Sequence, residues 1–353
     1  MTKIYLIRHA EAEGNIYRRA HGQVNGLIIG RGFAQIERLK QRFLDEKIDA
    51  VYSSDLIRAK QTANAIAEPH GLPVNTDPML REVNMGAWED IAWGDMEYLY
   101  PEMGRNFTVD PANWLVEGSE TLARVQERMD KCIRAIAGRH EGGCVAVLSH
   151  GFSIRAFICK VMGVPSHESM RVPYCDNTAV ALLHLENDEF IIEYQGDNSH
   201  LCSETSTFAN QTWWRKEKDR VKENVRFDLF DPDRDSELFK QRGGDAGDLS
   251  KSSKIYTAFL INEPAGIIGY GGDDDEKYNL IRLIYIKPEL RNNGFGAQLL
   301  GQVVSDLRKT KTEAIRIQAR AGSETAGFCS KYGFVKIGEA DMFDVFEKNI
   351  RNW

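Results

Sequence analysis

The chain has 353 residues, of which 42% are hydrophobic and 27% charged, as in a soluble protein with full-sized apolar cores. This length predicts two domains, because a domain usually holds about 100–200 residues. The net charge of −7 excludes broad nucleic-acid binding, which needs a basic face. No apolar signal core follows Met1, and no segment reaches the ~20 apolar residues of a membrane span.

The six cysteines stand at positions 132, 144, 159, 175, 202 and 329, without CxxC or CxxH spacing. This spacing indicates neither a zinc site nor a disulfide framework. Free thiols persist in a reducing compartment, so we expect a cytoplasmic protein. Since no group of His, Cys, Asp and Glu has metal-ligand spacing, we predict no metal ligands.

Apolar runs alternate with helical patterns over the first 200 residues. Strands are expected at 3–8, 50–54 and 144–150, helices at 32–45, 55–71 and 119–140, and a closing hairpin at 178–196. Asp55 and Ser119 are the expected N-caps of the second and third helix. Residues 85–118 lack periodicity and are expected to form a long loop. The alternation predicts a largely parallel sheet covered on both sides, with ligands at the carboxyl ends of its strands.

A second α/β pattern follows a polar segment at 203–222, whose charge run RKEKDRVKEN predicts a solvated linking helix. Strands are expected at 254–261, 266–272, 281–288 and 314–321, and a helix at 294–308. The acidic run 273–276 is expected to cap a hairpin, with attraction of a cationic amine as the alternative. We therefore predict a first domain at 1–202, a linking segment at 203–222 and a second domain at 223–353.

Phosphoryl transfer without a metal needs a nucleophile, cations for the phosphoryl oxygens and an acid for the leaving oxygen. His9 is the candidate nucleophile, with Arg8 beside it. The guanidinium group of Arg58 can donate hydrogen bonds to two phosphate oxygens at once. His150 ends the central strand, before a helix N-terminus that favours anions. Glu82 is the candidate acid because it lies outside any periodic element. Each residue alone is more often structural, but the set in this order indicates a site.

These residues stand within LIRHAEAEGN, GQVNGLIIGRGFAQ, SSDLIRAKQTA, LREVNMGAWED and VLSHGFSIRAF. In order and spacing the segments resemble the motifs of the histidine phosphatase superfamily, the phosphoglycerate-mutase-like family, over about residues 1–200. The resemblance implies a three-layer α/β/α fold, a phosphohistidine at His9 and a proton donor at Glu82. It implies a phosphate-binding set of Arg8, Asn15, Gln23, Arg58, His150 and Gly151, with Gln23 at the pocket rim.

The sequence departs from this family beside the expected pocket. Ala10 stands at a usual glycine, and Asn25, Leu27 and Ile29 replace the aspartate, proline and threonine of the next motif. These changes concern substrate fit more than chemistry. Mutases of the family carry an arginine-rich RRHYG-type loop that grips the substrate carboxylate, whereas WEDIAWGDMEYLYPE here is acidic and aromatic. Hydrolysis is therefore favoured over mutase chemistry.

The second candidate site is a glycine-containing turn between a predicted strand and helix, where backbone N–H groups can approach a pyrophosphate. IRLIYIKPELRNNGFGAQLL and AGFCSKYGFVKIGE resemble the GNAT acetyltransferase family over about residues 224–350. The resemblance implies an α/β GNAT fold and an acetyl-CoA site at Ile286, Arg291, Asn292, Asn293, Gly294, Phe295, Gly296 and Ala297. The family's acid tyrosine aligns with Cys329 and its glutamate with Arg282. Two roles stay equally open for Cys329: its thiol acts as the general acid, or it is a buried residue of the core.

The sequence as a whole predicts a bifunctional enzyme, in which a metal-independent phosphomonoesterase is joined to an acetyl-CoA-dependent N-acetyltransferase. The phosphatase half needs no cofactor, and the expected partners are a small phosphate ester and an amine acceptor, without nucleic acid or membrane. The alternatives are a non-catalytic CoA-binding or substrate-recruiting second domain, a phosphoglycerate-type mutase, and a phosphoprotein-binding scaffold. Both substrates and the oligomeric state stay open, with a homodimer among the alternatives.

Overall fold

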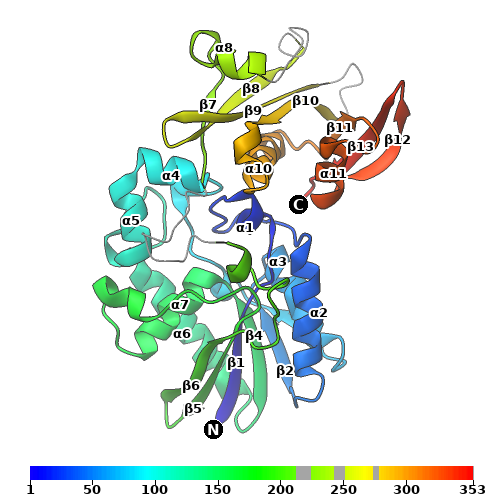
Figure 1. The fold of residues 1–353 in the computed structure, drawn as a ribbon. Helices are drawn as coiled ribbons and strands as arrows, with labels where there is room; N and C mark the ends of the chain where they lie inside the picture. Colours follow the sequence, from blue (N-terminus) through cyan, green and yellow to red (C-terminus); the bar gives the residue numbers. More distant parts are fainter. Residues whose placement is uncertain (212–223, 242–250, 273–277, 353) are drawn as a thin grey trace. The chain divides into compact units, whose positions relative to one another are not determined.

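The computed structural model describes residues 1–211, 224–241, 251–272 and 278–352, and Figure 1 shows its fold. The chain divides into two compact units. The first consists of Met1–Ala12, His21–Glu89 and Tyr100–Val221, and the second of Glu13–Ala20, Asp90–Leu99 and Lys222–Trp353. Two short segments of the predicted first domain thus belong to the second unit, and the predicted boundaries at 202 and 223 stay a prediction. The predicted linking helix and the acidic run at 273–276 lie outside the described residues.

A six-stranded sheet with the order β3-β2-β4-β1-β5-β6 forms the centre of the first unit. Its strands are β1 (Thr2–Arg8), β2 (Ala50–Ser53), β3 (Val74–Thr76), β4 (Cys144–Ser149), β5 (Val180–Glu186) and β6 (Glu189–Asp197). The first four are parallel, whereas β5 and β6 form an antiparallel hairpin beside β1. The predicted parallel sheet and closing hairpin are confirmed.

Helices cover both faces of this sheet. They are α2 (Arg31–Phe43), α3 (Ile57–Ala67), α6 (Leu122–Arg139) and α7 (Gly151–Val161). The shorter α5 (Pro101–Val109) packs on the 3-10 turns Pro111–Asn113 and Ser166–Arg171. In Figure 1, α2 and α3 lie on one face and α6 and α7 on the other. Phe43 of α2 belongs to one buried cluster with Ala146 and Leu148 of β4. Because strand side chains alternate between faces, Val145 and Val147, also buried, face the opposite layer.

Three local predictions for this region were wrong. Asp55 does not cap α3, which begins after Leu56 without a side-chain cap, because its carboxylate pairs with Arg81 at 2.5 Å. The hydroxyl of Thr121, and not Ser119, caps α6 by accepting the N–H of Arg124. Residues 85–118 are not one long loop, because they contain α4 (Trp93–Leu99) and α5. These helices have 7 and 9 residues, too few to show a clear apolar period.

The second unit is built on a seven-stranded sheet with the order β12-β13-β11-β10-β9-β8-β7. Its strands are β7 (Arg226–Leu229), β8 (Lys254–Leu260), β9 (Glu263–Gly272), β10 (Asn279–Ile286), β11 (Ala314–Ala319), β12 (Val335–Ala340) and β13 (Phe343–Asn349). Among the described strand pairs of this second sheet, only β10–β11 is parallel. The strands predicted at 254–261 and 266–272 are confirmed as β8 and β9, which pair in antiparallel fashion.

Two helices lie on opposite faces of this second sheet, α8 (Pro232–Gln241) and α10 (Phe295–Lys309), as Figure 1 shows. Leu238 of α8 packs on Ile267 of β9 and Leu283 of β10. On the other face α10 packs against the same two strands, and α11 (Glu324–Lys331) lies beside β11. Of the helices that the structure describes, none has both the length and the apolar character of a membrane span.

The two early segments of the second unit are bound to each other by their backbones. They contain α1 (Glu13–Tyr17) and α4. The N–H of Trp93 donates to the carbonyl of Arg18 at 2.9 Å, and the N–H of Ala20 to that of Ile91 at 2.8 Å. Within this unit α1 packs against α10, and α4 packs against β7.

Candidate active site

The carboxyl ends of three parallel strands meet at one edge of the first sheet. Arg8 at the end of β1 is in register with Ser149 at the end of β4, and Ser53 of β2 with Leu148. The next residues along β1 and β4 are His9 and His150, so their rings lie side by side with centroids 5.1 Å apart. Ligands bind at this edge in open parallel sheets.

The imidazole of His9 is held in one tautomer by its own loop. Its Nδ1 lies 2.7 Å from the carbonyl oxygen of Ala10, and because a carbonyl can only accept, Nδ1 carries the proton. The other ring nitrogen, Nε2, therefore keeps its lone pair. Burial, together with the charges of Arg58 and Arg8, lowers the pKa of His9 well below its usual value. A neutral imidazole with a free lone pair is the form that can attack a phosphorus atom.

Two buried guanidinium groups flank this histidine. Arg58, 1% exposed, donates to the carbonyls of His21, Gly22 and Val24 at 3.3, 2.8 and 2.9 Å. Burial lowers its pKa to about 10, so it stays charged at neutral pH. Arg8 donates through Nη1 to the carbonyl of Cys175 at 2.6 Å. The Nε of each arginine is buried, and within the described part of the chain it has no hydrogen-bond partner.

His150 is fully buried, and neither of its ring nitrogens has a partner among the described residues. Burial and the charge of Arg58 lower the pKa of His150 well below its usual value. It stands at the start of α7, and a Cβ on the next residue, Gly151, would lie 3.2 Å from Nε of Arg8. Arg8, Arg58 and His150 thus leave buried donors unused around His9. Buried polar groups are normally satisfied, so this set indicates an anion site.

Glu82 lies in the loop between the 3-10 turns Pro78–Leu80 and Gly86–Trp88, and its side chain accepts hydrogen bonds from the start of α7. Its carboxylate accepts the N–H of Phe152 at 3.1 Å and the N–H and hydroxyl of Ser153 at 2.9 and 3.1 Å. The side chain therefore caps the helix that follows His150. Arg128 of α6 fixes the backbone of this loop by donating to the carbonyls of Arg81 and Glu82 at 2.7 and 3.1 Å. Before it can donate a proton, this carboxylate must first take one up.

Gln23 and Asn15 lie in different units. The amide of Gln23 donates to the carbonyl of Glu82 at 3.1 Å, so it contacts the loop of the predicted acid. Asn15 is on α1, which belongs to the second unit. The phosphate-binding role of both residues stays a prediction.

Three organising residues were not predicted from the sequence. Asn177 donates its side-chain N–H to the carbonyl of His9 at 2.9 Å, and Arg128 holds the Glu82 loop. The carboxylate of Glu89 accepts the N–H groups of Gln23, Val24 and Met85 at 2.9 to 3.1 Å. Except for Met85, four residues from Glu89, the backbone groups that they bind are far away in the sequence. Only the position of Asn177, three residues before β5, could have drawn attention to it.

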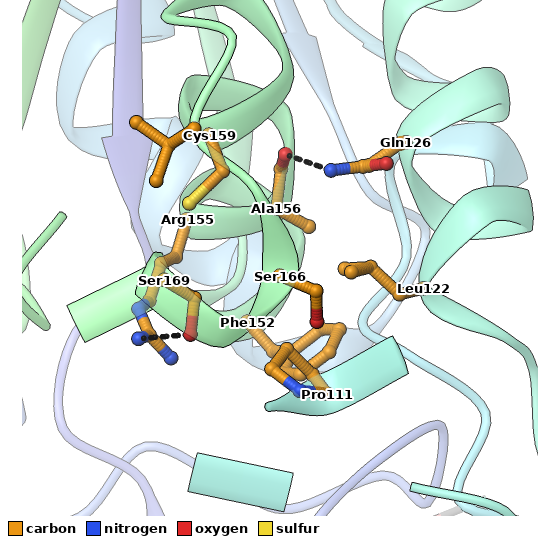
Figure 2. Close-up of a pocket in the computed structure, with 10 residues that line it drawn as sticks. Pro111, Leu122, Gln126, Phe152, Arg155, Ala156, Cys159, Ser166 and Ser169 are labelled. Carbon is orange, nitrogen blue, oxygen red and sulfur yellow. Dashed lines mark hydrogen bonds between the residues drawn. The ribbon is translucent and has the colours of Figure 1, made fainter. Parts of the chain in front are cut away.

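A small cavity lies on another side of α7, shown in Figure 2. Phe152, Ala156 and Cys159 line it at helical spacing, and Gln126 and Ser169 contact Ala156 and Arg155 there. Its interior has room for roughly one water molecule. This space is too small for a substrate, so the candidate site stays at the strand ends. No three His, Cys, Asp or Glu side chains of the described residues gather as a metal site.

The turn before α10 is the second candidate site. Asn292 and Gly294 have φ of 64° and 82°, and Gly294 provides no side-chain cap for a helix of 15 residues. The first N–H groups of such a helix need acceptors, which a pyrophosphate can supply. Among the described residues β10 pairs with β11 only through Asn279–Ile281, although it pairs with β9 as far as Ile286. The two parallel strands therefore diverge next to the turn.

Other residues of the predicted cofactor set have contacts within the protein. Arg291 pairs with Glu324 at 2.8 Å, and Asn293 donates to the carbonyl of Leu290 at 3.2 Å. A Cβ on Gly296 would lie 2.9 Å from the ring of Phe328, so this glycine serves helix packing. Ile286, Phe295 and Ala297 are buried.

Cys329 is completely buried in α11. Burial raises the pKa of its thiol to about 12. A thiol so reluctant to ionise is a weak acid catalyst, which favours the core role that the sequence left open. Arg282, at the position of the family glutamate, lies at a register shift of β10 and donates to the carbonyl of Gly272 at 3.1 Å.

A parallel sheet with buried histidines and arginines at its carboxyl edge is typical of an α/β enzyme that handles phosphate. The chain belongs to the histidine phosphatase superfamily (branch 1), whose sequence model matches residues 4–198. Residues 241–347 match the acetyltransferase (GNAT) domain. The predicted family and fold of both halves are confirmed.

Known proteins resemble the first half over nearly their whole length. Phosphoserine phosphatase 1 of Hydrogenobacter thermophilus is 31% identical over 57% of this chain and 95% of its own. The probable phosphoglycerate mutase GpmB of Serratia proteamaculans is 28% identical over the same shares. The structure of YhfR from Bacillus stearothermophilus has a TM-score of 0.55 and 27% identity, over 57% of this chain and 99% of its own.

The neutral histidines predict that acid destabilises the fold. Burial lowers the pKa of His9 and His150, and that of His200 to about 4, whereas in the unfolded chain each titrates near 6.5. Unfolding therefore takes up protons below about pH 6.5, and each group lowers the free energy of unfolding by up to about 1.4 kcal/mol per pH unit until its folded pKa is reached.

Urea denaturation at about pH 7.5 and about pH 5.5 measures this loss. The double variant His9→Gln with His150→Asn should show a shallower dependence on pH than the wild type. Equal slopes for the two proteins would mean that these imidazoles are not held neutral.

Proposed function

We propose that the first half of the chain hydrolyses small phosphomonoesters through a phosphohistidine at His9, and that the second half is an acetyl-CoA-dependent N-acetyltransferase. The observation that supports the first part most is the set of unused buried donors of Arg8, Arg58 and His150 around a neutral His9. A phosphoryl group carries oxygens for these donors, and its charge would offset the two buried cations.

In the first step the lone pair on Nε2 of His9 attacks the phosphorus, and the bond from phosphorus to the ester oxygen breaks. The electron pair stays on the leaving oxygen, which takes a proton from the protonated carboxyl of Glu82. Arg8 and Arg58 hold the equatorial oxygens, where negative charge is spread in the transition state. His150 donates to the same group through one ring nitrogen.

In the second step a water molecule attacks the phosphohistidine, and the bond from phosphorus to Nε2 breaks. The electron pair of that bond returns to Nε2. The Glu82 carboxylate accepts the proton of the water and regains the protonated form from which the first step started. Orthophosphate then leaves, and His9 is neutral again.

Hydrolysis is favoured over mutase chemistry because the stretch that would hold the carboxylate-gripping arginines is acidic and aromatic. The names of the relatives direct the choice of substrate, since one is a phosphoserine phosphatase and another a probable phosphoglycerate mutase. L-Phosphoserine and 3-phosphoglycerate are therefore the first esters to test, within a wider set of phosphometabolites. The alternative of a phosphoglycerate-type mutase would show transfer of the phosphoryl group to a second position of the same acid.

The second half is proposed to bind acetyl-CoA at the turn before α10. A pyrophosphate suits the helix start at Gly294, which has no side-chain cap and follows Asn292 in a left-handed conformation. A pantetheine arm could bind to backbone groups of β10 near Ile286, where this strand diverges from β11. When bound, acetyl-CoA supplies the acetyl thioester. The competing proposal is a module that binds CoA or recruits substrate without turnover, supported by the burial of Cys329 and by Arg282 at the position of the family glutamate.

The variant His9→Ala should lose at least about 10³-fold of the hydrolysis, because the covalent path needs the imidazole. The assay uses L-phosphoserine, 3-phosphoglycerate and an aryl phosphate in buffer with EDTA, and acid-labile phosphohistidine is trapped during turnover. The variant His70→Ala, at a histidine bound only to helix and loop carbonyls, is the matched control. A folded His9→Ala protein with more than a few per cent of wild-type activity would contradict the proposal that His9 is the nucleophile.

The variant Glu82→Gln should slow the hydrolysis of alkyl esters by about 10²-fold or more, and that of p-nitrophenyl phosphate only a few-fold. Glutamine keeps an acceptor oxygen for the N–H groups of α7 but has no proton to give to a poor leaving group. Single-turnover rates on both ester types measure the difference. An equal loss on both types would move the proton donor to another group.

Calorimetry of the full chain with CoA and acetyl-CoA tests the second half. The variant Gly294→Val should weaken binding at least about tenfold, because a side chain is strained at φ 82° and blocks the helix start. Gly322→Val, also at positive φ with open space around it, is the matched control and should bind like the wild type. A folded wild type without binding heat at about 1 mM ligand would contradict the CoA site. Turnover of Cys329→Ser with a panel of amines then separates the two roles of Cys329. A loss of turnover would favour the thiol as acid, and unchanged turnover would favour a core residue.

A further inference from the structure

Helix α10 is buried around its whole circumference, which is unusual for a helix that covers a sheet. One face packs on β9 and β10. The opposite face has residues at helical spacing that are small or polar, and they are Gln298, Gly301, Gln302, Ser305 and Arg308. Polar side chains on a covering helix normally face water, so the burial of this second face calls for a partner.

The partner is the segment 13–20 of the same unit. Nη2 of Arg308 pairs with the fully buried carboxylate of Glu13 at 2.8 Å. Arg19 donates to the side chains of Gln302 and Ser305 at 2.8 and 3.0 Å. A Cβ on Gly301 would overlap the side chain of Tyr17. The second face of α10 is therefore shaped for α1 and the residues after it.

The segment 90–99 is held in the same unit by its own contacts. Arg19 joins the two segments by donating to the carboxylate of Asp90 at 2.9 Å. The carboxylate of Asp95 accepts the N–H of Phe227 in β7 at 2.9 Å, and a Cβ on Gly94 would overlap the backbone of Val225. Both segments lie within residues 4–198, which match the phosphatase family, yet they pack on residues beyond it.

Both segments continue directly into loops of the phosphatase site. Segment 13–20 follows His9 by four residues and precedes 21–24, where the carbonyls that hold Arg58 lie. Segment 90–99 follows Glu89, whose carboxylate fixes the backbone of residues 23, 24 and 85. Each segment is thus bonded directly to a residue of such a loop, so a shift of the segment would move that residue.

We infer that α10, a helix of the acetyltransferase-family unit, positions the loops of the phosphatase site, and that Gly301 and Arg308 are positioning residues for the hydrolysis. This inference rests on the proposed phosphatase function. The two residues act through α1 and contact no substrate. Displacements of about 1 Å near a reacting group cost up to about 10²-fold in rate, so small changes on this face should be measurable.

The first test compares two alanine substitutions at helical glycines of the full chain. Gly301→Ala places a Cβ against Tyr17, whereas a Cβ at Gly327 in α11 meets open space. We expect Gly301→Ala to lower kcat/KM for the best ester by about 10- to 100-fold and to raise KM, with Gly327→Ala within about twofold of the wild type.

The second test changes the ion pair. Arg308→Met removes the partner of Glu13 and should lower kcat/KM by about tenfold or more, and Arg308→Lys should restore most of it because it keeps the charge. Lys309→Met removes the same charge from the next residue, whose side chain is 70% exposed, and should have little effect. The burst of phosphohistidine counts folded sites, so rates per burst site separate positioning from loss of folded protein.

The outcomes separate this inference from the function on which it rests. Altered KM or altered rates per burst site in Gly301→Ala and Arg308→Met, with rescue by lysine, support the inference. Wild-type kinetics in both variants would overturn the inference but not the proposed phosphatase function. A smaller burst with unchanged KM and unchanged rate per site would do the same, because it reports a loss of folded protein. A wild type without hydrolysis or phosphohistidine would overturn both.

Discussion

The candidate phosphatase site depends on two guanidinium groups that are buried beside two imidazoles. A buried donor without a partner costs about 1–3 kcal/mol, and more when it is charged. Three loop carbonyls accept hydrogen bonds from Arg58, and one carbonyl accepts a hydrogen bond from Arg8. The Nε atoms of both arginines have no hydrogen-bond partner among the described residues. Burial, together with the same charges, lowers the pKa of His9 and His150 and keeps both rings neutral. One arrangement thus favours an anion at this site and keeps the candidate nucleophile uncharged.

The loops around these cations are organised by single side chains that bind several backbone groups. The carboxylate of Glu89 holds three N–H groups, and Arg128 holds the carbonyls of the Glu82 loop. Glu82 itself caps α7, which places a candidate acid at a helix start where a carboxylate is favoured. The proposed proton transfer therefore requires Glu82 to exchange a stabilising acceptor role for a donor role in each turnover.

The glycines at the start of helix α10 and within it have different structural roles in the second unit. Gly294 has φ of 82°, which starts the helix after the candidate CoA turn. Gly296 makes room for the ring of Phe328, and Gly301 for Tyr17. Spacing alone suggests a glycine-rich phosphate turn, whereas the contacts assign only Gly294 to the turn and the other two to packing. One helix thus joins a candidate cofactor turn, a sheet and the segment that follows His9 in the chain.

The sequence by itself determined the two families and the parallel sheet, and it predicted the main candidate site residues. Runs such as CVAVLSH and motifs around His9, Arg58, Glu82 and His150 are local, and local order along parallel strands puts their ends at one edge. Only the tertiary structure decided that Asp55 pairs with Arg81 instead of capping α3, and that Thr121 caps α6. It also decided the short helices within 85–118 and the burial of Cys329. It also decided that residues 13–20 pack on α10. Contacts between residues nearly 300 positions apart, such as Glu13 and Arg308, leave no periodic trace in a single sequence, because nothing in the local pattern of either segment depends on the other.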